Sequence, residues 1–171
     1  MRKILSAAIA AFVSVNAAAQ MMEVPEAVRV PPGHTMSMKA VGVGELTYEC
    51  RAKANDATAF EWAFVGPVAR LTDAAGGKEL GKYYAGPTWE AADGSKVTGK
   101  QVAIAPAAPG SIPLQLVKAE PTTGNGAMSG ITYIQRVNTK GGVAPGEPCA
   151  AASAGVKKQV PYQADYVFYK M

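Results

Sequence analysis

Short runs of alternating apolar and polar residues, separated by turn-forming residues, constrain the fold of this chain more than any other feature. Phe60, Trp62 and Phe64 alternate with other residues and run into Gly66 and Pro67. Successive side chains of a β-strand point to opposite faces of a sheet, so a period of two is typical of a strand. The pattern recurs along the chain and predicts an all-β fold of about eight or more short strands. We expect an antiparallel β-sandwich or a flattened barrel with long Pro-, Gly- and Ala-rich loops.

The clearest predicted hairpin lies between Pro87 and Ile104. Two strand-like runs flank Asp93 and Gly94, a pair that tolerates the positive φ of a tight turn. Glycines near the start of the domain are expected to break a strand: Gly42 and Gly44 should interrupt the first strand. Residues 105–112 are rich in Pro and Ala, so we expect a crossing loop there.

The first nineteen residues have the composition of a secretory signal peptide. Arg2 and Lys3 precede an apolar run over residues 4–15, and three alanines precede Gln20. The run is too short to span a bilayer. We therefore expect a signal peptide over residues 1–19, a single β domain over residues 20–171, no membrane span after cleavage, and a periplasmic or secreted location.

The charge of the chain argues against a nucleic-acid partner. The formal net charge is +4 at pH 7, and Arg2 and Lys3 of the targeting segment contribute to it. The remaining basic residues are scattered and do not form the basic stripe typical of nucleic-acid-binding proteins. A mild positive charge instead suits weak attraction to anionic polymers of the cell envelope. The sequence gives no indication of the oligomeric state.

Two cysteines, Cys50 and Cys149, are predicted to form one disulfide. An even number of cysteines in an exported protein is typical of disulfide bonding. A metal site built on two thiolates would need further ligands, and His34 is the only histidine of the chain. We therefore expect no metal and no cofactor, and a covalent link between the first third and the last quarter of the chain.

Aromatic and polar residues near the predicted hairpin form a candidate ligand site. Glu90 and Asp93 place two carboxylates beside the ring of Trp89, where a sugar or a hard cation could bind. Turn chemistry explains the same residues without a ligand, because Asp and Gly satisfy a tight turn and Trp packs inward. Tyr84 adds a second aromatic platform, and we expect Arg136 to line a polar and aromatic groove. These five residues are the predicted ligand-binding set.

A second pattern, formed by His34, Met36 and Met38, has the ligand types of a copper site. Imidazole and thioether groups suit Cu(I), and alternate positions on a strand share one face. The same spacing also suits an apolar core face, in which Met is a common filler. With one imidazole to offer, copper binding is the least favoured of the functional hypotheses.

The run from Gly81 to Glu90, followed by Asp93, Gly94 and Ser95, resembles the domain-of-unknown-function family 3455. Further marks of that family lie around it in order: Tyr48, Glu49, Cys50; Ile112, Pro113, Leu114; Ile131 to Arg136; Thr139, Gly141, Gly142, Pro145, Cys149; Pro161, Tyr162, Ala164, Asp165, Tyr166, Phe168, Tyr169. The resemblance spans residues 33–169. It implies an exported protein of a kind found in bacteria and fungi, and it implies no particular activity.

Few side chains of this sequence fit catalysis at neutral pH. No serine lies in a strand-to-helix elbow, and His34 is the only candidate imidazole base. We therefore expect no catalytic residues, and the leading hypothesis is an exported, non-enzymatic β-sandwich that binds a glycan or protein of the cell envelope or extracellular space. The alternative is a hydrolase or lyase acting on a polysaccharide, with Glu90 or Asp93 as acid or base.

Overall fold

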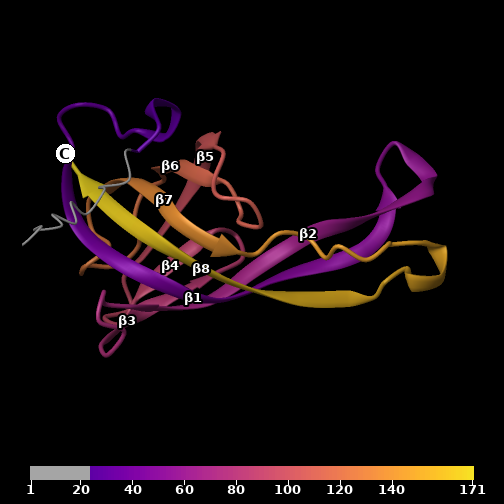
Figure 1. The fold of residues 1–171 in the computed structure, drawn as a ribbon. Coiled ribbons are helices and arrows are strands. Elements are labelled where there is room, and N and C mark those ends of the chain that lie inside the picture. Colours follow the sequence, from indigo (N-terminus) through magenta and orange to yellow (C-terminus); the bar gives the residue numbers. More distant parts are fainter. Residues whose placement is uncertain (1–23) are drawn as a thin grey trace, which may run out of the picture.

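The computed structural model describes residues 24–171, and the predicted signal peptide lies outside them. Its eight strands close into one antiparallel barrel in chain order, with β8 returning to pair with β1 (Figure 1). The predicted all-β class is confirmed, in its barrel form. The elements are η1 (Glu26–Val28), β1 (Thr35–Lys53), β2 (Asp56–Thr72), β3 (Glu79–Tyr84), β4 (Thr88–Ala91), β5 (Lys96–Ala105), β6 (Leu114–Ala119), β7 (Ile131–Gly141), η2 (Ala151–Ser153) and β8 (Lys157–Lys170).

Several strands are longer than the sequence predicted, and the expected interruption at Gly42 and Gly44 is wrong. β1 runs without a break for 19 residues, and β2 for 17. A Cβ atom on Gly44 would lie 2.0 Å from the carbonyl oxygen of Val68, and one on Gly42 would lie 2.6 Å from the ring of Tyr166. The two glycines therefore permit close approach inside a continuous strand.

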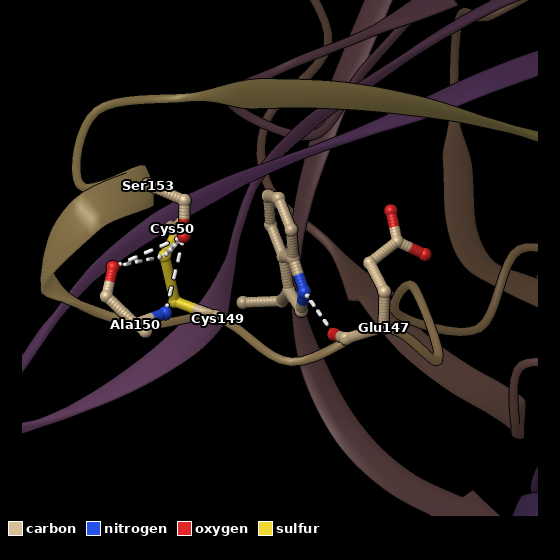
Figure 2. Close-up of a disulfide and its surroundings, with 6 residues drawn as sticks. Cys50, Glu147, Cys149, Ala150 and Ser153 are labelled. Atoms are coloured by element: carbon tan, nitrogen blue, oxygen red, sulfur yellow. Dashed lines mark hydrogen bonds between the residues drawn. A yellow bond between two sulfur atoms is a disulfide. The ribbon is translucent and has the colours of Figure 1, made fainter.

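Beyond the barrel, β1, β2 and β8 continue as a three-stranded extension, which we call the arm (Figure 1). The part of β2 before Val68 and the part of β8 before Tyr162 pair with β1 alone. The loop over residues 142–156 lies along the arm, and the predicted disulfide between Cys50 and Cys149 fastens it there (Figure 2).

A hydrogen bond adds a second attachment of this loop. The indole Nε1 of Trp62 on β2 donates to the carbonyl oxygen of Glu147 at 2.9 Å. The inner face of the arm is thus covered at its far part by the loop, and it stays open near the barrel, where the side chain of Phe64 is 52 % exposed.

Aromatic rings fill the barrel interior. Trp89 of β4 stacks on Tyr83 of β3 with 4.7 Å between ring centroids, and it meets Tyr166 and Phe168 of β8 edge-on. Such stacked and edge-to-face pairs add to the stabilisation from area burial. The predicted hairpin at Asp93 and Gly94 is confirmed, since it joins β4 to β5.

The segment around η1 packs on the outer surface of the barrel. Val28 is fully buried against Ala105 and Leu116, and the side-chain amide of Gln135 donates to its carbonyl oxygen at 2.6 Å. Both faces of the sheet are therefore buried here. Among the described residues, none of the helices is long and apolar enough to cross a membrane.

Candidate functional site at the barrel mouth

Glu90 and Tyr84, two of the predicted ligand-binding residues, lie together on the outer surface of the barrel. The Tyr84 hydroxyl donates to Glu90 Oε2 at 2.8 Å, and the Nζ atoms of Lys82 and Lys96 lie 3.3 and 3.2 Å from the same carboxylate. The bond from Tyr84, followed by those from the two lysines, holds the pKa of Glu90 below its ordinary value. This carboxylate is ionised and already has three partners.

Trp89 and Asp93 take the positions that turn chemistry requires. Trp89 is 1 % exposed and points into the core, so it offers no surface to a sugar. The carboxylate of Asp93 accepts bonds from the hydroxyl and backbone N–H of Ser95 and from the backbone N–H of Ala127. These bonds, with that from the Ser95 hydroxyl largest, lower the pKa of Asp93. Asp93 therefore ties the β4–β5 turn to the loop before β7.

The proposed copper ligands do not share one face. A β-bulge between Met36 and Met38 places Met36 opposite Tyr169 and Met38 opposite Phe168, which are consecutive residues of β8. Met36 is 64 % exposed, whereas Met38 packs against the core. His34 lies with its ring edge-on to Tyr133, 4.9 Å between centroids. The extra residue of the bulge breaks the alternation on which this prediction depended.

Arg136, the last of the predicted residues, points into the barrel. It lies on β7 opposite Gln115 of β6 on one side and opposite the buried Tyr166 of β8 on the other. Its Nε and Nη2 atoms donate to the carbonyl oxygen of Pro113 at 3.2 and 2.9 Å. Because two of its donors are held by the backbone, the guanidinium has a fixed position at this end of the barrel.

A cavity of about 190 Å³ opens in front of Arg136. It lies at the end of the barrel from which the arm extends, and we call it the mouth. The lining residues from β2 and the β3–β4 turn are apolar, and those from β5, β6 and β7 include amide and guanidinium groups. The apolar wall includes Phe64, Gly66, Pro67, Ala85 and Pro87, and the polar wall is formed by Gln101, Gln115 and Arg136.

The electrostatics of the interior leave the charge of Arg136 without a counterion. Burial raises the pKa of Tyr48, Tyr83, Tyr162 and Tyr166, and the nearby charge of Arg136 opposes this only in part. These phenols are therefore neutral at physiological pH. Within residues 24–171, no carboxylate forms an ion pair with Arg136. The mouth is consequently a positively charged, partly buried site.

A larger hollow of about 730 Å³ lies on the outer wall, between the N-terminal segment and the loop around residues 106–111. Its buried carboxylate, Asp165, is neutralised by Lys39 Nζ at 2.9 Å and accepts a bond from the Asn138 amide at 3.3 Å. Asn138 has a φ of 51° within a β-bulge of β7. The buried carboxylate of this hollow is paired with a lysine, whereas Arg136 of the mouth has no carboxylate partner among the described residues.

Sequence reasoning identified Arg136 and missed the other residues of the mouth. The structure brings Arg136 together with Phe64, Gln101 and Gln115, and separates it from the Tyr84–Glu90 pair and from the Asp93 turn. A usable signal was present in the chain. Gln115 and Val117 occupy alternate positions of one strand and thus share a face, so a polar residue stands where the core pattern requires an apolar one.

A comparison with family models finds a match over most of the chain. Residues 31–170 match the family model described as "Protein of unknown function (DUF3455)". Searches of curated proteins and of solved structures find no match. The family match covers the barrel, the arm and the mouth.

Proposed function

Since the chain belongs to the DUF3455 family of proteins of unknown function, we propose a role from its own geometry: an exported, non-enzymatic protein that binds a glycan of the cell envelope or extracellular space. The ligand enters the mouth of the barrel. An envelope protein is the alternative ligand, and the experiment below distinguishes the two.

The observation that supports this proposal is the pairing of two unlike walls in one cavity. Sugars have apolar C–H faces and polar edges, so they suit an aromatic or flat apolar wall opposite amide and guanidinium donors. The mouth provides the exposed ring of Phe64 with Gly66 and Pro67 on one side, and Gln101 and Gln115 on the other.

The size of the cavity indicates how much of a glycan it holds. Sites for drug-sized molecules have volumes of roughly 300–1,000 Å³. The mouth, at about 190 Å³, is smaller, so it accommodates a single unit of a larger chain. The remainder of the glycan would lie along the open part of the arm.

The lowered pKa values and the hydrogen bonds of Glu90 and Asp93 favour a binding role over a catalytic one. A general acid for glycoside cleavage needs a raised pKa and a partner carboxylate across a cleft. The pKa values of Glu90 and Asp93 are both lowered, and both carboxylates are engaged in structural hydrogen bonds. These features favour a binding protein over the alternative, a polysaccharide hydrolase or lyase.

Export is supported by the disulfide and by the composition of the N-terminal segment. Disulfides persist in oxidising compartments and are rare where thiols are kept reduced. The bond between Cys50 and Cys149 therefore suits the periplasm or the extracellular space.

The proposal is tested by measuring binding to immobilised glycans and to protein fractions of the envelope, with protein purified after export of the full chain. We expect binding to a subset of glycans that Phe64→Ala weakens. Val43→Ala, which shortens another exposed apolar side chain on the outer face of β1, serves as the control and should leave binding unchanged. Absence of glycan binding, or turnover of a glycan that Glu90→Gln abolishes, would contradict the proposal.

A further inference from the structure

We infer that the glycan unit bound in the mouth is acidic, and that its carboxylate is held by Arg136. This inference rests on the proposed function and adds the chemical class of the ligand. It predicts that the protein distinguishes a uronic acid from the neutral form of the same sugar.

The donors of Arg136 provide the first argument. A guanidinium has five N–H donors in a planar fork, and a carboxylate accepts two of them side by side. The carbonyl oxygen of Pro113 takes one N–H from Nε and one from Nη2. Among the described residues, the remaining three N–H groups have no acceptor, so a pair of donors is available to a carboxylate.

The second argument is the charge balance of the mouth. An arginine side chain is positively charged at every physiological pH, and a partly buried charge without a counterion is unfavourable. The ion pairs of the described residues lie on outward-facing or arm residues and do not include Arg136; examples are Lys82 and Lys96 with Glu90, and Lys100 with Glu120. An anionic ligand would neutralise Arg136, whereas a neutral sugar would leave its charge as it is.

The two glutamines provide a third, geometric argument. The side-chain amide of Gln115 donates to Gln101 Oε1 at 2.7 Å, which fixes both amides beside Arg136. Gln115 keeps its own oxygen as an acceptor, and Gln101 keeps its amide donors. The polar wall therefore offers a cation for a carboxylate next to groups of both hydrogen-bonding types for ring hydroxyls.

The experiment compares uronic acid oligosaccharides with their methyl esters. Galacturonate, glucuronate and mannuronate trisaccharides and the corresponding esters have the same rings and linkages, and they differ in charge. Titration calorimetry with the exported protein is expected to show about 10- to 100-fold tighter binding of at least one acid than of its ester, the range that a charged hydrogen bond provides.

Two variants locate the effect. Arg136→Gln should weaken binding of the acid by about 10- to 100-fold and binding of the ester by much less, because the ester has no charge to pair with the guanidinium. Gln115→Glu places a carboxylate opposite Arg136 and removes the amide donor to Gln101 Oε1, so it should weaken binding of the acid more than binding of the ester, even if the first variant folds poorly. Arg70→Gln and Gln159→Glu make the same charge changes at exposed positions outside the mouth and should bind as the unmodified protein does.

The outcomes separate this inference from the proposed function. Equal affinity for acids and esters, with both weakened by Phe64→Ala, would overturn the acidic ligand and leave a glycan-binding protein. Acid binding that neither Arg136→Gln nor Gln115→Glu reduces would also overturn the inference. Absence of binding by every acid and ester, together with no binding to other glycans, would overturn both proposals.

Discussion

Replacing Tyr162 and Tyr166 together by phenylalanine is expected to make the protein less sensitive to alkaline pH. Both rings lie in the barrel interior, 3 % and 1 % exposed, and their hydroxyl oxygens are 3.2 Å apart. Burial, the largest influence on either phenol, raises the pKa of both well above the ordinary value of about 10. The folded protein therefore holds these protons more tightly than the unfolded chain does.

The magnitude follows from this difference in proton binding. Below pH 10 the tyrosines are neutral in both states, and their contribution to the free energy of unfolding is fully present. As the pH rises above 10, the unfolded chain loses protons that the folded chain keeps, so the free energy of unfolding falls. The slope approaches about 1.4 kcal/mol per pH unit for each tyrosine, which gives about 3 kcal/mol for the pair at pH 11.

The double substitution isolates this effect because each hydroxyl is the other's partner. Removing both leaves no unpaired group, so stability at pH 7 should change by less than about 1 kcal/mol. Urea unfolding followed by circular dichroism at pH 7 and pH 11 measures the free energy at both pH values. The unmodified protein should lose about 3 kcal/mol more than the variant between the two. Equal losses would refute the assignment of these two phenols as buried and protonated.

Three further predictions concern the framework around the mouth. Reducing the disulfide, which joins residues 99 positions apart, should lower stability by up to about 4–5 kcal/mol and the melting temperature by on the order of 10 °C, and an unchanged melting curve of fully reduced protein would contradict this. Gly44→Ala should lower the free energy of unfolding by about 2 kcal/mol or more, because its Cβ would meet backbone atoms of β2. Gly146→Ala is the control: its Cβ would meet no atom within 4 Å, so the free energy of unfolding should change by less than about 0.5 kcal/mol. Equal unfolding midpoints for the two variants would contradict the close packing of β1 on β2. Asp93→Ala should lower the melting temperature and accelerate hydrogen exchange of the Ala127 amide, and unchanged exchange would show that this carboxylate does not hold the loop.

The local features of this fold were predictable because they depend on neighbouring residues alone. Alternation of side chains indicated strands, and Asp93 with Gly94 indicated the hairpin between β4 and β5. The single pair of cysteines indicated the disulfide. Each of these predictions needs only a short segment of the sequence or the number of cysteines in the chain.

The features that the sequence did not reveal depend on how distant strands meet. Gly42 and Gly44 were expected to end a strand, yet they lie in β1 where the ring of Tyr166 and the backbone of β2 approach it closely. The bulge between Met36 and Met38 likewise becomes visible only when β1 is paired with β8. Closure of a barrel fixes strand tilt and stagger together, and no single segment contains that information.

The candidate site also combines residues that the local sequence identifies with residues that only strand pairing brings together. Proximity in sequence grouped Tyr84, Trp89, Glu90 and Asp93, but successive residues of a strand face opposite sides, so Trp89 entered the core while Glu90 stayed outside. Arg136 was selected for its chemistry, and its inward direction follows from its pairing with Tyr166. Its neighbours in the mouth come from other strands and were therefore not found.

The central claim, that the mouth is the ligand site, is tested most directly by a nuclear magnetic resonance titration of ¹⁵N-labelled protein with envelope glycan fragments. We predict that the signals of Gly66 and Ala85 and the side-chain signals of Gln101, Gln115 and Arg136 shift together and saturate at one stoichiometric equivalent per chain. Shifts confined to the outer surface around Glu90, or to the far end of the arm, with the mouth signals unmoved, would contradict the claim.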